Sequence, residues 1–258
     1  MAAPSLDGCL AKIKRADENI AGLNVEIGQA LDTYRLVRQP QLRSFAGRIQ
    51  PPANEQETLI RFGVLAGEII HHLRSSLDHL VWQLVRVRGE YPLTAHLEFP
   101  IFLDPEKFKS AAPRKIQGVP SDAATLIEQA QPYHRGGEND PLWILHDLDI
   151  HDKHRVLIVT ASAMTMYTRF DQTGQFRGFT LLKPSAPEPG VEIHPAYFPF
   201  APLDYRADSP EVNVNPQEAF QIVFRDFGLA KYEPVIPRLS ELSQFVAFYA
   251  RAFGRFFP

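Results

Sequence analysis

The sequence predicts an α+β protein in which a long antiparallel helical hairpin and a C-terminal helix surround an inserted antiparallel β-meander. Near the N-terminus, apolar residues recur at spacings of three and four over two long stretches, as they do on one face of a helix. In the second half, β-branched and aromatic residues become frequent, which favours strands. The chain also has 22 prolines among 258 residues, too many for an all-helical protein.

The first two helices are expected over about residues 5–37 and 55–88, joined by a connector that contains Pro51 and Pro52. Their similar lengths predict a helical hairpin. The apolar seam of the first helix has two interpretations: it packs against the second helix in the same chain, or it forms a homodimer through the long helices. The seam consists of Leu6, Cys9, Ile13, Ala16, Ile20, Leu23, Ile27, Ala30 and Tyr34.

The remainder of the chain divides by pattern into three further sections of a single domain, 1–258. Residues 91–153 predict loops and short helices, residues 154–230 an antiparallel sheet, and residues 234–257 a C-terminal helix. Within these sections, the extended segment is expected at 97–102, helices at 121–130 and 141–153, and strands at 156–168, 176–182, 191–194, 212–214 and 220–225.

The composition sets limits on location and partners. It is ordinary for a globular protein, with 45% hydrophobic and 22% charged residues, and a net charge of −3 gives no overall basic field. A single cysteine, Cys9, allows no intrachain disulfide, which fits a reducing cytoplasm. The N-terminus lacks a signal-peptide pattern, and no apolar run approaches membrane-spanning length, so no membrane partner is expected.

The second helix carries an unusual set of polar residues, and we expect the functional site to be built around it. Arg74 is followed five positions later by His79. This spacing on a long helix resembles the signature of HEPN-type proteins, although Ser75 differs from the Asn, Asp or His that commonly follows the arginine. The resemblance implies metal-independent RNA cleavage between two copies of the chain, with Arg74 stabilising the phosphate and His79 transferring a proton.

A structural interpretation of the same helix is also open. Arg74 and Asp78 are four residues apart, so their side chains are neighbours on the helix surface and can simply form an ion pair. The nearby histidines would then be solvated surface residues.

A second polar stretch lies at the end of the helix expected at 141–153. Asp147, His151 and His154 share one helix face at a spacing typical of metal ligands, and these residue types suit zinc, iron or manganese. The alternative is an ordinary polar helix C-terminus, where Lys153, His154 and Arg155 meet the negative end of the helix dipole.

If the two polar stretches face each other, they form one cleft for a phosphodiester or another anion. Arg74, Asp78, His79 and His151 would then be the catalytic residues. The substrate-binding residues would be His71, His72, Arg135, Lys153 and Arg155.

Together these patterns favour a HEPN-like ribonuclease or RNA-binding protein that uses no cofactor, of the sort found in defence or toxin systems. The first alternative is a metal-dependent hydrolase or metal-binding protein that holds a divalent metal with Asp147, His151 and His154. The second alternative is a non-enzymatic interaction module.

Overall fold

The structure is a computed structural model dominated by helices, with strands confined to two-stranded antiparallel sheets in the part of the chain that it describes. None of the described helices combines the length and the apolar character needed to cross a membrane. The described residues are 3–38, 47–87, 96–157, 159–163, 166–170, 176–181, 220–225, 230 and 233–257.

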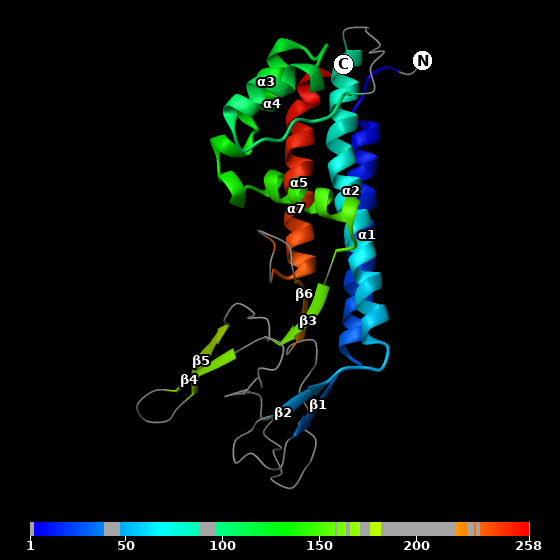
Figure 1. The fold of residues 1–258 in the computed structure, drawn as a ribbon, viewed down its shortest axis with the longest axis vertical. Coiled ribbons are helices and arrows are strands. Elements are labelled where there is room, and N and C mark those ends of the chain that lie inside the picture. Colours follow the sequence, from blue (N-terminus) through cyan, green and yellow to red (C-terminus); the bar gives the residue numbers. More distant parts are fainter. Residues whose placement is uncertain are drawn as a thin grey trace.

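Helices α1 (Asp7–Leu31) and α2 (Glu55–Arg86) lie side by side and antiparallel, which confirms the predicted hairpin (Figure 1). Helix α1 is shorter than expected, because the chain leaves the helix after Leu31 and residues Arg35–Arg38 (β1) pair with Gly47–Gln50 (β2). The buried side chains of α1 follow the predicted spacing of three and four: Cys9, Ile13, Ala16, Ile20, Leu23, Ile27 and Leu31.

The C-terminal helix α7 (Val235–Ala252), followed by a short 3₁₀ turn η4 (Phe253–Phe256), is the third member of a helical bundle (Figure 1). It packs against both α1 and α2, and the Ser243 hydroxyl donates to Asp17 Oδ1 of α1 at 2.5 Å. The apolar seam of α1 is therefore covered within the chain, as the first of the two interpretations predicts.

A set of shorter helices lies beside the bundle: α3 (Pro105–Lys115), α4 (Ser121–Gln129) and the 3₁₀ turns η1 (Pro132–His134) and η2 (Gly137–Asn139). They lead to α5 (Pro141–His154), which crosses α2 (Figure 1). The prediction missed α3. Its start uses the same device as that of α5: the Asp104 carboxylate accepts a hydrogen bond from the backbone of Glu106 and is followed by proline.

The strands pair differently from the predicted meander. Strands β4 (Met166–Phe170) and β5 (Phe176–Leu181) form the predicted antiparallel hairpin. Strand β3 (Val159–Ala163), however, pairs with β6 (Phe220–Phe224), which is distant in sequence, and not with its neighbour β4. The strands expected at 191–194 and 212–214 lie outside the described residues.

Candidate functional site

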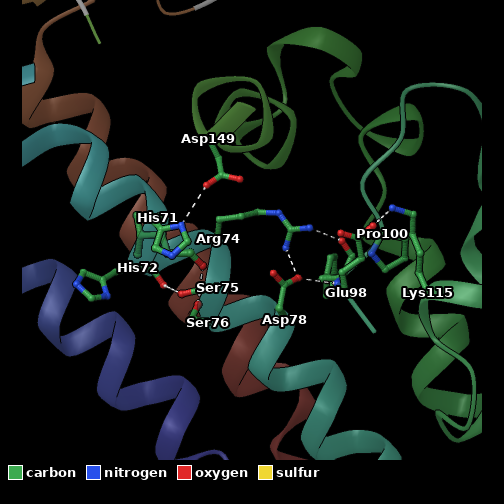
Figure 2. Close-up of polar contacts among 12 residues, drawn as sticks. His71, His72, Arg74, Ser75, Ser76, Asp78, Glu98, Pro100, Lys115 and Asp149 are labelled. Atoms are coloured by element: carbon green, nitrogen blue, oxygen red, sulfur yellow. Dashed lines mark hydrogen bonds and ion pairs between the residues drawn. The ribbon is translucent and has the colours of Figure 1, made fainter. Parts of the chain in front are cut away.

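Arg74 is one of the most deeply buried polar residues of α2, with 5% of its surface exposed. Its Nη1 donates to Asp78 Oδ1 at 2.5 Å, and its Nη2 donates to the carbonyl oxygen of Phe99 at 2.9 Å (Figure 2). Asp78 Oδ1 in turn accepts from the backbone N–H of Phe99 at 2.8 Å. The expected Arg74–Asp78 pair is therefore confirmed. Together the two side chains bind both the carbonyl oxygen and the N–H of Phe99.

The segment held in this way, residues 97–102, is neither helix nor strand, and it was predicted to be extended. The Gln131 side chain accepts from the Phe102 N–H at 3.0 Å and donates to the Pro100 carbonyl at 2.8 Å. The Glu98 N–H donates to the Lys115 carbonyl at 3.1 Å, and the two side chains also form an ion pair. The backbone of this segment bonds to Arg74 and Asp78 on one side and to Gln131 and Lys115 on the other. The segment therefore covers the face of α2 that carries Arg74.

His79 lies on a different side of the same helix. Five residues correspond to a rotation of about 140° around a helix, so Arg74 and His79 point away from each other. Arg74 faces residues 97–102, whereas the exposed His79 lies beside the first turns of α1, where a Cβ added at Gly8 would be 3.6 Å from its Nδ1.

His72 and His79 are seven residues apart and share the side of α2 that faces α1. Burial lowers the pKa of both imidazoles, and the positive charge of Lys12 on α1 lowers both further. Asp78 opposes this effect at His79, while Arg15 adds to it at His72. One lysine of α1 therefore acts on two histidines of α2, and both imidazoles favour the uncharged form at neutral pH.

His71 points the other way, toward α5 (Figure 2). Its Nδ1 lies 3.6 Å from Asp149 Oδ1, and the second oxygen of this carboxylate is 2.6 Å from Lys153 Nζ. The Asp149 side chain is only 2% exposed, whereas those of His71 and Lys153 are 60% and 54% exposed. The two polar stretches of the sequence do meet, but through Asp149, which the sequence analysis did not single out.

The close approach of α5, and of the segment that follows it, to α2 depends on two glycines one turn apart. A Cβ at Gly67 would stand 2.1 Å from Asp152 Oδ1, and a Cβ at Gly63 would stand 2.1 Å from the carbonyl oxygen of Leu157. Burial, with the negative charge of Asp149, raises the pKa of Asp152. The sequence analysis also missed this contact, although glycines at i and i+4 in a long helix are a signal for it.

His146 of α5 completes the inner side of the site. Burial lowers its pKa to about 4, and the nearby positive charge of Arg74 acts in the same direction. Its Nδ1 is buried and has no hydrogen-bond partner. This imidazole is therefore uncharged in the folded protein at neutral pH. The sequence analysis did not single it out.

The residues proposed as metal ligands are only partly brought together. His151 Nδ1 lies 2.7 Å from the backbone oxygen of Asp147 and 3.5 Å from its carboxylate, while His154 is exposed at the end of α5. Over the described ranges, no three His, Cys, Asp or Glu side chains are grouped so that they could hold a metal ion.

Two of the expected substrate-binding arginines also have definite places. Arg135 donates to Asp140 at 2.8 Å and to the Tyr249 hydroxyl, and its guanidinium lies 4.8 Å from the ring centres of Phe245 and Tyr249. It therefore ties the loop before α5 to α7. Arg155 is exposed immediately after α5.

Comparison of the chain with protein-family models, with curated proteins and with solved structures finds no match. The resemblance to HEPN-type proteins therefore depends on Arg74 and His79 alone. These two side chains point away from each other, so they do not form one reactive centre.

Proposed function

We propose that this chain is a metal-independent RNA-cleaving protein whose reactive centre consists of His72, His79 and Lys12, while Arg74 serves the fold. The observation that supports this proposal is electrostatic: the charge of Lys12 on α1 lowers the pKa of both imidazoles on α2. Relative to the sequence-based hypothesis, His79 keeps its proton-transfer role and Lys12 replaces Arg74 as the cation that contacts phosphate.

Two imidazoles and an ammonium group can together cleave RNA. One imidazole takes the proton of a 2′-hydroxyl, the 2′-oxygen forms a bond to phosphorus, and the bond from phosphorus to the 5′-oxygen breaks. The second imidazole, in its protonated form, gives its proton to the leaving 5′-oxygen. Lys12 stabilises the negative charge that develops on the phosphate oxygens. The products are a 2′,3′-cyclic phosphate and a 5′-hydroxyl.

The ionisation state of the site is consistent with these roles. Both histidines have a pKa below the usual value, so the neutral form needed by the base predominates at pH 7. The acid needs the protonated form, so the cleavage rate is expected to be highest on the acidic side of neutrality. RNA as the partner and a cytoplasmic location belong to this proposal.

The proposal is tested by a cleavage assay on a mixed RNA pool in EDTA. We expect wild-type protein to cleave, and His72→Ala or His79→Ala to reduce the rate by about 100-fold or more, because a proton-transfer group is lost. Lys12→Ala should also reduce the rate, because the phosphate loses its cation. The 5′-hydroxyl and cyclic phosphate ends are identified by mass spectrometry.

Matched controls are Lys14→Ala, which removes an exposed lysine that pairs with Glu18 on the same helix, and His154→Ala, which removes an exposed histidine of α5. Both should cleave as well as the wild type, and circular dichroism should show all variants folded. Undiminished cleavage by the two α2 histidine variants would contradict the proposal. Activity that disappears in EDTA and returns with a divalent cation would favour the metal-dependent alternative.

The non-enzymatic alternative is favoured by two buried side chains that are engaged with other parts of the chain: Asp149 of α5 with His71 of α2, and Arg74 with the Phe99 carbonyl. Such a network gives α2 a defined surface without requiring chemistry. If purified wild-type protein cleaves no RNA under any of these conditions, this alternative becomes the better description of the chain.

A further inference from the structure

A cavity of about 320 Å³ lies where the C-terminal half of α1, strand β6 and the first turn of α7 come together. Strand β6 contacts both of these helices, so the walls of the cavity come from three elements that are far apart in the sequence (Figure 1). The apolar part of the walls includes Ile27 and Leu31 of α1, Ile222 of β6 and Ile236 of α7. All but Ile236 are buried, so they lie at the bottom of a recess and not on an open apolar surface.

The polar groups of the cavity include two amides. Asn24 of α1 and Gln221 of β6 line it from two different elements, and each side-chain amide can donate and accept a hydrogen bond. Among the described residues that line the cavity, none carries a charge. A ligand that enters would therefore lose its water without meeting a counter-ion, which is costly for an ion and favourable for an uncharged apolar molecule.

We propose that this cavity binds an uncharged, largely apolar small molecule that carries a hydroxyl or carbonyl group for the two amides. The volume of the cavity is at the lower end of the range for small-molecule sites, which is roughly 300–1,000 Å³. A protein partner would need a contact surface of about 800 Å² on each side, whereas a cavity of this volume accepts little more than one side chain. The charged phosphate of a nucleotide makes it a poor ligand for the same walls.

The cavity is separate from the proposed reactive centre. Asn24 follows Lys12 by twelve residues on α1, which corresponds to about 18 Å along the helix axis. Binding at the cavity and cleavage of RNA can therefore be measured independently, and failure of one proposal leaves the other standing.

The probe is 2-naphthol, which is uncharged at pH 7 and carries one hydroxyl on two fused apolar rings. Isothermal titration calorimetry on the full chain should show saturable binding at one site. In 2-naphthoate, a carboxylate replaces the hydroxyl on the same rings. We expect 2-naphthoate to bind about tenfold more weakly or worse, because its charge has no partner in the cavity.

Two glycines of α1 supply a matched pair of variants. Gly28 lines the cavity, so the side chain of Gly28→Leu would occupy part of it and should weaken the binding of 2-naphthol by about tenfold. Nothing lies within 4 Å of a Cβ added at Gly22, so Gly22→Leu adds the same side chain outside the cavity and should bind like the wild type. Circular dichroism checks the folding of both variants. If Gly28→Leu does not fold, Asn24→Asp gives the same test, because it places a negative charge at the cavity from an exposed position.

The results that would support or overturn the inference are distinct. Saturable binding of 2-naphthol that is weakened in Gly28→Leu or Asn24→Asp and kept in Gly22→Leu would support it. Equal affinity of the cavity variant and the wild type would show that the probe binds elsewhere and would overturn it. No binding of 2-naphthol up to its solubility limit, or equally tight binding of 2-naphthoate, would overturn it as well.

Discussion

The Arg74 guanidinium shows how a residue that resembles a catalytic group can instead serve the fold. It is 5% exposed, and its two terminal nitrogens bond to Asp78 and to the Phe99 carbonyl. A buried arginine with both ends engaged has little freedom to bind a phosphate. The proposed chemistry therefore shifts to the more exposed side of α2, where Lys12 replaces the guanidinium as the available cation.

Substitution of Arg74 should test this role through stability. We expect Arg74→Ala to lower the free energy of unfolding by about 3–5 kcal/mol, because Asp78 keeps a partly buried charge and the Phe99 carbonyl loses its partner. Arg74→Lys should lower the free energy of unfolding by less, because the ammonium group keeps the positive charge beside Asp78. Some loss should remain, because the ammonium group cannot reach both acceptors at once. Urea unfolding measured by circular dichroism gives these values.

The control is Lys109→Ala, which removes an exposed lysine paired with Glu106 and should leave the unfolding midpoint unchanged. If Arg74→Lys kept wild-type stability but lost RNA cleavage, Arg74 would have to contact the substrate, and the role suggested by the HEPN resemblance would be restored.

At the residue scale, the sequence predicted only what lies within one helix. The Arg74–Asp78 pair and the shared face of His72 and His79 follow from helical geometry alone. The electrostatic effect of Lys12 on the two histidines could not be predicted, because it depends on how α1 and α2 are aligned along their length. The apolar seam predicts that these helices pack together. It does not predict their alignment, because shifting α1 along α2 by one helical turn would preserve nearly the same apolar contacts.

At the scale of elements, the docking of α5 onto α2 depends on the absence of side chains at two positions. We expect Gly63→Ala to destabilise the fold by about 2 kcal/mol, because the new methyl group would collide with a backbone carbonyl, that of Leu157. Gly67→Ala should cost less, since it meets the Asp152 carboxylate, which can rotate away. Thermal unfolding of both variants gives the comparison.

Gly22 of α1 is the matched control, because nothing lies within 4 Å of a Cβ added there. In this position Gly22→Ala should stabilise the protein by up to about 1 kcal/mol, since alanine is the better helix former. If all three substitutions were stabilising, the close contact between α5 and α2 would be refuted.

Helices α1, α2 and α7 were predicted from their continuous apolar period, whereas α4 and α5 were predicted from the residues at their starts. Helix α3 was missed because its pattern is short and contains Pro113, although the Asp104–Pro105 start was a usable signal. The β3–β6 pairing could not be inferred, because residue types indicate that a segment is extended but do not identify its partner strand.

For the whole molecule, the buried His146 makes stability depend on pH. Its folded pKa of about 4 lies below the ordinary value of 6.5, so the unfolded chain binds more protons between these two values. The stabilising contribution is fully present above pH 6.5 and is lost as the pH falls toward 4. Between pH 7 and pH 5, we expect a decrease of about 2 kcal/mol in the free energy of unfolding.

Urea unfolding at a series of pH values measures this dependence, and His146→Leu is the informative variant. Leucine fills a similar space without a titrating group, so the decrease between pH 7 and pH 5 should become smaller in this variant. A His146→Leu protein with the same pH dependence as the wild type would show that other groups cause it.

The single cysteine of the chain gives the helical hairpin a reporter of its own motion. Cys9 is completely buried between the long helices, and burial raises the pKa of its thiol to about 11. A reagent that needs an exposed thiolate can react only after α1 has separated from its neighbours. The rate of thiol modification therefore measures how often the bundle opens at Cys9 while the rest of the protein stays native.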